Sequence, residues 1–346
     1  MEGSLSAGLR RSRRRAVGLG LLALLAAMAV ALFSGDTPIT PPALLEALRS
    51  RGEPGSERLL SIVLRIRAPR LALAAAAGAG LGLAGALLEC ILANPLASPF
   101  TLGVSSAAGF GASLAIVAGR SFLGGGLGIV GNAFGFALAA SLAVYALAAT
   151  LGASPLLIVL AGMGLNFLFS SLTTLLYYFS SPEAVYRALF WTSGSLSGAS
   201  WRLAATLGFV LAFSLLAARP LLYDLSLIAE GEREASVVGV DVRKVRLACL
   251  ALASLLAAAA VSLVGVIGFI GLVAPHLCRM LGQDDPRSLV PLSAAAGGTL
   301  LVLADLAATR LAAPVILPIG AVTSLLGVAF LFALVLARKG RLWSLS

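Results

Sequence analysis

The sequence predicts an all-α integral membrane protein with about ten transmembrane helices in one domain of 346 residues, and three observations support this class. Hydrophobic residues make up 59% of the chain and charged residues 12%, whereas soluble proteins average about 45–50% and about 25%. The mean hydropathy is +1.01. Apolar runs of about 20 residues, enough to cross a bilayer as a helix, recur along the chain. These properties exclude a water-soluble enzyme, a disordered chain and a fibrous protein.

The N-terminus combines a basic segment with an apolar run. Five arginines stand at positions 10–15, ahead of the apolar run at 16–33. A secretory signal has the same order of charged and apolar segments. This run is long enough to span a membrane, and no clear small-residue cleavage site follows it. We therefore expect a basic cytoplasmic segment at 1–15 and an uncleaved first span at 16–33.

The nine other spans follow from apolar runs separated by short polar segments. We expect a short outer helix at 182–192 and a polar cytoplasmic loop at 219–246. The span at 269–281 is too short to cross a bilayer alone, and glycines and Pro275 interrupt this region. Broken helices of this kind occur where backbone lines a cavity or packs inside protein. The expected spans lie at 70–92, 102–118, 128–150, 155–179, 202–218, 247–267, 269–281, 289–308 and 318–337.

The distribution of basic residues predicts the orientation. More of the 25 Lys and Arg residues fall on the side shared by 1–15, 219–246 and the C-terminus than on the other side. The positive-inside rule then puts both termini in the cytoplasm. The net charge of +10 is also compatible with nucleic-acid binding. Because the basic residues flank apolar spans, we expect membrane lipid and no nucleic acid as a partner.

The chain carries no motif for chemistry of its own. It has no phosphate-binding loop of the GxxxxGK[ST] type, no HExxH and no serine-nucleophile elbow. Cys90, Cys249 and Cys278 lie in or beside apolar stretches without metal-ligand spacing. We therefore expect no enzyme, metal or bound cofactor here, so that uphill transport would need an ion gradient or a partner. A gradient-driven carrier needs ionisable residues inside the membrane, and Glu89 and Asp305 are the two candidates.

The loop at 219–246 is the most informative polar segment. Residues 225–240 predict two short helices broken near Gly239, with acidic residues in the first and basic residues after the second. Helix dipoles favour this order of charge. A structured, charged loop of this kind suits docking of a soluble partner, although a merely solvated connector has the same composition.

Eight short motifs occur in order along nearly the whole chain. The longest reads VGVIGFIGLVAPH at 264–276. The others are RAPRL at 67–71, NPLA at 94–97, LGVS at 102–105, LAG at 160–162, GSLSGASW at 194–201, AD at 304–305 and LPIG at 317–320. Together they resemble the FecCD-type permeases, the membrane subunits of ABC importers for iron–siderophore complexes, haem and cobalamin.

The resemblance implies the type II ABC importer permease fold, with ten spans and a second copy of the chain in a homodimer. It also implies two ABC ATPase subunits, which hold ATP and Mg, and a periplasmic or lipoprotein substrate-binding protein. The implied location is the bacterial cytoplasmic (inner) membrane. The implied cargo is an iron chelate, whether siderophore or haem, or cobalamin. An ion-gradient-driven secondary transporter remains the alternative.

The resemblance also assigns an outer docking surface. Arg67 and Arg70 match the arginines of the family's Arg-x-Pro-Arg motif, which pair with glutamates of the binding protein in the cobalamin member. A third docking arginine aligns with Thr309, and Arg310 stands one residue further along. The alternative is that these arginines snorkel at the membrane interface or position the second span.

At the inner face, Asn94 and Leu96 match a gate segment of the family, although Asn-Pro also suits a plain turn. The family's second gate segment aligns with 154–156, where this chain has a proline, so we leave it unassigned. Glu89 stands where the family usually has Gln and is a pathway candidate. His276 either touches substrate or fixes the broken helix. Within 225–240 the resemblance implies helices that couple to the ATPase, with Ile228, Glu230, Glu232, Glu234, Val238 and Gly239 as the coupling residues.

Overall fold

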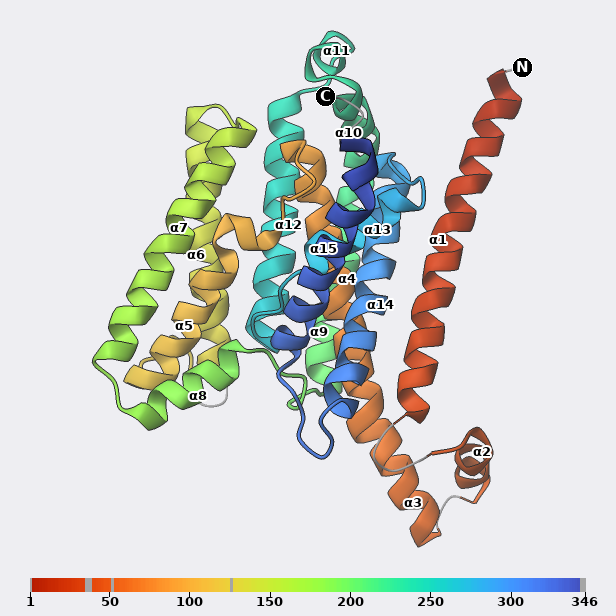
Figure 1. The fold of residues 1–346 in the computed structure, drawn as a ribbon, viewed down its shortest axis with the longest axis vertical. Helices are drawn as coiled ribbons and strands as arrows, with labels where there is room; N and C mark the ends of the chain where they lie inside the picture. Colours follow the sequence, from red (N-terminus) through yellow and green to blue (C-terminus); the bar gives the residue numbers. More distant parts are fainter. Residues whose placement is uncertain (1, 35–38, 51–52, 125–126, 343–346) are drawn as a thin grey trace.

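The computed structural model describes residues 2–34, 39–50, 53–124 and 127–342, and all of the regular structure in these ranges is helical (Figure 1). Residue 1 of the expected basic segment 1–15 lies outside the described residues, as do the side chains up to residue 11. The arginines at positions 10 and 11 are therefore not placed.

The ten expected spans are all present as helices, which confirms the predicted fold class. Among the described residues, seven helical stretches are long and apolar enough to cross a membrane, while α5, α13 and the apolar part of α15 are shorter. The helices are α1 (Glu2–Phe33), α4 (Ala68–Leu92), α5 (Val104–Ala118), α6 (Gly128–Leu151), α7 (Pro155–Tyr178), α9 (Trp201–Ala218), α12 (Val242–Val264), α13 (Ile270–Met280), α14 (Pro286–Arg310) and α15 (Ile319–Leu342).

Helix α4 starts earlier than the sequence indicated. It continues α3 (Pro54–Ser61) through a π-helical stretch, η1 (Ile62–Arg67), in one helical run of 39 residues. Pro69 explains the π-helical register, because proline lacks an N–H and its ring clashes with the carbonyl four residues earlier. The N–H of Ala68 accordingly donates to the carbonyl oxygen of Val63, five residues earlier, which is the π-helical bond, and not to the residue four positions earlier. The expected outer segment therefore includes the first turns of the central helix.

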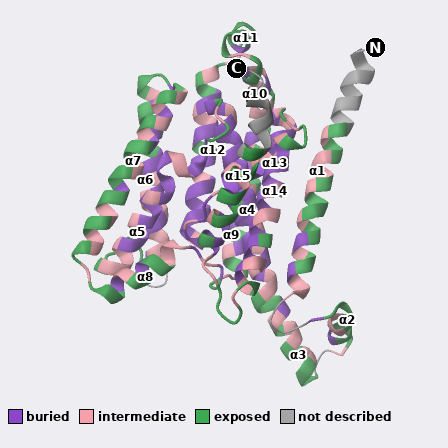
Figure 2. Cartoon of the chain, viewed as in Figure 1, coloured by how far each residue is buried: buried purple, intermediate pink, exposed green. Residues whose placement is uncertain are grey.

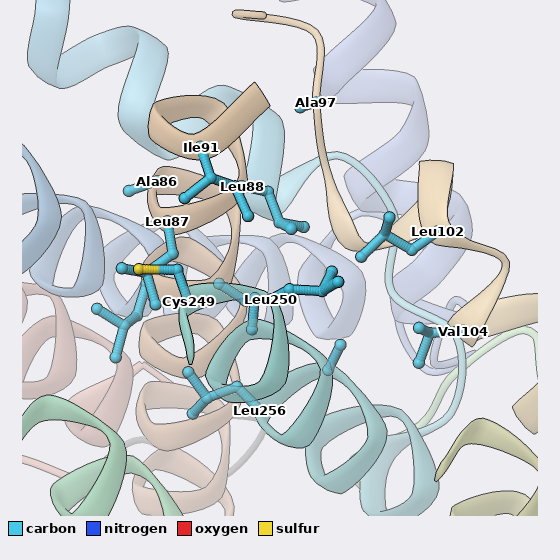
Figure 3. Close-up of a cluster of buried hydrophobic side chains, with 14 of the residues drawn as sticks. Ala86, Leu87, Leu88, Ile91, Ala97, Leu102, Val104, Cys249, Leu250 and Leu256 are labelled. Atoms are coloured by element: carbon cyan, nitrogen blue, oxygen red, sulfur yellow. The ribbon is translucent and has the colours of Figure 1, made fainter. Parts of the chain in front are cut away.

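Helix α4 runs through the middle of the bundle, and most of its residues are buried, whereas few of the described residues of α1 and α7 are (Figure 2). Small residues allow α13 and α14 to approach it closely. A methyl group on Gly82 would overlap the carbonyl oxygen of Ser293, and one on Gly85 would overlap that of Gly271. On another side, α4 and α12 share the largest buried cluster, which includes Leu88, Ile91, Cys249, Leu250 and Leu256 (Figure 3).

The connecting helices mark two opposite ends of the bundle (Figure 1). Helices α10 (Leu221–Glu230) and α11 (Glu232–Val237) lie at what we call the α11 end, together with the start of α1 and the end of α15. Helices α2 (Pro41–Arg49), α3 and α8 (Pro182–Thr192) lie at the α8 end. The short 3₁₀ helix η2 (Pro99–Leu102) leads from α4 into α5.

The predicted break before α13 is present at 265–268. It bonds to the irregular segment that follows α8, which in turn bonds to the start of α15. The N–H of Ser195 donates to the carbonyl oxygen of Val264, and the N–H of Val266 donates to the carbonyl oxygen of Thr192. The N–H of Gly320 donates to the carbonyl oxygen of Ser193. Non-helical backbone inside a membrane protein needs such internal partners. Gly265 has φ +79 and lies against Gly194, where any side chain would overlap backbone.

Candidate functional site

The polar loop at the α11 end forms two helices. The break between α10 and α11 lies at Gly231, and a second break, at 238–241 around the expected Gly239, separates α11 from α12 (Val242–Val264). Gly231 has φ +156, a backbone conformation that side chains oppose, and Gly239, with φ +94, ends α11. The expected break near Gly239 is thus present, whereas the one at Gly231 was not predicted.

The six predicted coupling residues divide into two groups. Ile228 is 9% exposed and belongs to the main buried cluster, so it faces the bundle. The others are exposed on the outside of the loop: Glu230, Glu232, Glu234, Val238 and Gly239. The exposed group is available to a soluble partner, whereas Ile228 anchors α10 to the bundle.

The predicted gate residues lie in a tight turn at the same end. Helix α4 stops at Ala93, which has φ +47, and the Asn94 side-chain oxygen accepts a hydrogen bond from the N–H of Leu96 at 2.9 Å. Asparagine favours turns of this kind because its side chain mimics a backbone acceptor. Leu96 is 60% exposed. The structure places both residues in the turn that follows α4 at the α11 end; their position at an inner mouth and their gating role stay predictions.

Arg246 connects this turn to the loop, and it is a residue that the sequence did not single out. Its Nε donates to the carbonyl oxygen of Ile91 and its Nη1 to that of Ala153, both at 3.0 Å. Its Nη2 donates to Glu232 Oε1 at 2.5 Å. Arg246 is 6% exposed although it lies near the start of α12, where a basic residue normally indicates only orientation.

Glu89 and Arg279 lie in a cavity at the α11 end with a volume of about 540 Å³. The Arg279 Nε lies 3.3 Å from Glu89 Oε2, and its Nη1 lies 3.7 Å from Asp284 Oδ1. Glu89 is 2% exposed, and an arginine partner offsets the cost of burying its charge. The cavity is also lined by Asn94, Ile228, Glu232, Arg246 and His276. Residues assigned separately to the gate, the coupling loop and the pathway thus share one space.

His276 packs its ring edge-on against Phe330 of α15, with centroids 5.8 Å apart. This contact links the broken helix α13 to α15 and fits the structural alternative for His276.

At the α8 end, Arg70 is held by Asp305 of α14. Its Nε and Nη2 donate to the two carboxylate oxygens at 2.8–3.2 Å, and the Asp305 side chain is 6% exposed. Arg67 donates to the carbonyl oxygen of Leu32 at the end of α1 at 2.9 Å. Arg310 lies exposed in the last turn of α14. Arg67 and Arg70 therefore each bond to another helix of the bundle, and the docking role of all three arginines stays a prediction.

Comparison with known proteins identifies relatives of the whole chain. The profile of the FecCD transport family matches residues 22–337. The achromobactin transport system permease protein of Dickeya dadantii is 34% identical over 93% of this chain and 91% of its own length. The vitamin B12 import system permease protein of Klebsiella pneumoniae is 34% identical over 96% of each chain. The iron(3+)-hydroxamate import system permease protein of Bacillus subtilis is 32% identical over 89% of this chain and 92% of its own.

Solved structures agree with this relationship. A transporter in an inward-facing conformation, described as a metal-chelate type ABC transporter, superimposes with a TM-score of 0.82 at 29% identity, covering 94% of this chain and 99% of that one. PsaBC from Streptococcus pneumoniae, at 17% identity and a TM-score of 0.54, shares the fold, covering 85% of this chain and 95% of its own. This chain is therefore a multi-pass membrane protein with the type II ABC importer permease fold, and it belongs to the FecCD transport family.

Proposed function

We propose that this chain is the permease subunit of an ABC importer that carries an iron chelate, either a siderophore or haem, or cobalamin. The observation that carries the proposal is the family match over residues 22–337. The names of the relatives cover achromobactin, vitamin B12 and iron(3+)-hydroxamate. The substrate class is therefore a bulky metal chelate, and the particular chelate is left to experiment.

The proposed assembly contains two copies of this chain, two ATPase subunits and a periplasmic or lipoprotein substrate-binding protein in the bacterial inner membrane. ATP and Mg belong to the ATPases. Helices α10 and α11 would contact those subunits, which places the α11 end in the cytoplasm. The start of α1 and the end of α15 lie at the same end (Figure 1), in accord with both termini being cytoplasmic.

Transport in this assembly would couple ATPase movement to the inner mouth. Movement of α10 and α11 would change the turn at Asn94 and Leu96, because Arg246 joins the loop to the end of α4. The substrate-binding protein would dock at the α8 end, where Arg67, Arg70 and Arg310 lie. Charges at such a surface orient the partner and raise its rate of association more than its affinity.

The test is uptake into proteoliposomes that hold this chain with its ATPase and binding protein. Labelled ferric siderophore, haem and cobalamin are offered separately, with and without ATP. We expect ATP-dependent uptake of one of them. Uptake by the chain alone without ATP would contradict the proposal, and so would a complex that hydrolyses ATP and moves none of the three.

Docking is tested in the same vesicles with Arg67→Glu. The reversed charge repels the acidic groups of the binding protein, so uptake should fall, and it should fall more at low salt, where screening is weak. Arg120→Glu is the matched control, because Arg120 is exposed in the loop between α5 and α6 at the same end. Equal effects of the two reversals would exclude a specific docking role for Arg67.

A further inference from the structure

The three acceptors of Arg246 belong to three segments that are separate in the sequence. Ile91 is the penultimate residue of α4, and the turn that holds Asn94 and Leu96 follows the end of this helix. Ala153 precedes α7 in the turn aligned with the family's second gate segment. Glu232 is the first residue of α11. One side chain thus joins the end of α4 and the turn before α7 to the coupling loop.

The chemistry of arginine suits this position. Its planar guanidinium presents five N–H donors in a fixed arrangement, whereas a lysine ammonium is a compact charge on a flexible stem. The carbonyls of Ile91 and Ala153 lie at the ends of α4 and α6, where carbonyl groups lack partners within the helix. A positive charge there is also favoured by the helix dipole. Arg246 therefore holds two helix ends at a set distance from each other.

The third contact differs from the other two in exposure. The side chain of Arg246 is 7% exposed and that of Glu232 is 53% exposed. Glu232 is therefore the member of the pair that a soluble partner on α11 can reach. A shift of α11 would move the Glu232 carboxylate, and the short charge-assisted hydrogen bond would carry the guanidinium with it.

We propose that Arg246 is a positioning residue that transmits movement of α11, through the Glu232 carboxylate, to the predicted gate turn at Asn94 and Leu96 and to the turn before α7 at once. This inference rests on the proposed function and deepens it, because it names the contact that couples ATP hydrolysis to the inner mouth. In this inference the turn at Ala153, to which the sequence assigned no role, moves together with the turn at Asn94 and Leu96.

The experiment uses the complete complex in proteoliposomes and measures ATP hydrolysis and substrate uptake together. Glu232→Gln keeps the size of the side chain and removes its charge. Arg246→Lys keeps the charge and loses the three-way geometry. We expect both variants to hydrolyse ATP near the wild-type rate while uptake falls roughly threefold to tenfold, so that ATP used per molecule imported rises in proportion. Glu232→Asp retains the carboxylate and should recover part of the uptake.

Two conservative substitutions serve as controls. Arg243→Lys changes an exposed arginine in the same turn of α12, whose Nη2 donates to the carbonyl oxygen of Ala149. Glu183→Gln removes an exposed carboxylate from α8, at the opposite end of the bundle. Both should leave the ratio of ATP to substrate unchanged. If Arg246→Lys fails to fold, Glu232→Gln still provides the test, because Glu232 is half-exposed.

A second readout needs no substrate. Leu96→Cys, in a background with Cys90→Ala, is labelled with a hydrophilic maleimide in the detergent-solubilised complex with the ATPases, before and after vanadate trapping. We expect trapping to change the labelling rate at position 96, and Glu232→Gln to abolish that change. An unchanged response in Glu232→Gln, or an unchanged ratio of ATP to substrate, overturns the inference. A wild-type complex that imports nothing contradicts the proposed function, while the labelling still decides the inference.

Discussion

At the residue scale, Glu89 is the titratable group that distinguishes an ATP-driven permease from a gradient-driven carrier. It is buried and lies 3.3 Å from the Arg279 Nε. If ATP drives transport, Glu89→Gln should retain uptake within about threefold, since a glutamine oxygen can still accept a hydrogen bond from Arg279. A proton-coupled carrier would lose transport, because Gln cannot titrate. Uptake is measured with and without an imposed proton gradient, and Glu183→Gln controls for general effects of the substitution.

The pair of Arg70 and Asp305 is predicted to stabilise the fold. Asp305→Asn leaves a mostly buried guanidinium without its counter-charge, and we expect a loss of about 3 kcal/mol in the free energy of unfolding. This loss of stability is measured as a shift in the SDS concentration at which half of the helix signal in circular dichroism is lost. The control is Asp241→Asn, in the exposed pair of Asp241 with Lys244, which should show no measurable change because exposed pairs contribute little. Equal midpoints for both variants would refute the structural role.

At the element scale, the packing of α4 depends on glycines at particular positions. Gly82→Ala should destabilise the bundle by about 1–3 kcal/mol, because the added methyl group would overlap the backbone of α14. Gly80→Ala on the same helix is the matched control, since its methyl group would lie 3.5 Å from Leu256, an ordinary contact. Alanine also has the better helix propensity, so Gly80→Ala should be neutral or stabilising. The same SDS titration compares the stabilities of the two variants. A Gly80→Ala variant less stable than Gly82→Ala would contradict the α4–α14 packing.

At the scale of the whole molecule, the two ends of the bundle are predicted to face opposite sides of the membrane. Val238 directly follows α11 and is 67% exposed, and Phe122 is 68% exposed in the connection between α5 and α6, which lies at the α8 end (Figure 1). In a Cys90→Ala background, Val238→Cys should react with a membrane-impermeant maleimide only in inside-out vesicles. Phe122→Cys should react in intact spheroplasts. Labelling of both positions from one side would contradict this topology.

Some features of the molecule were predicted from local properties of the chain. Span positions depend on runs of apolar residues, so helices such as α6 and α14 begin and end within a few residues of their expected bounds. The start of α4 also agrees within two residues, but its continuation from Pro54 in one helical run was not predicted, because the charged residues at 65–70 interrupt the apolar pattern. The break at Gly239 was predicted and the one at Gly231 was missed, because a single glycine inside a helical pattern does not by itself show where a helix ends.

The sequence by itself determined the fold class, the family and the positions of the predicted gate and coupling segments. Each of these depends on composition or on motifs of neighbouring residues. Only the tertiary structure decided which charges meet: Arg70 with Asp305, 235 residues away, and Arg246 with Ile91, Ala153 and Glu232. The physical reason is that a buried charge takes whichever partner the packing of helices brings within hydrogen-bonding distance, and spacing along the chain does not encode that distance.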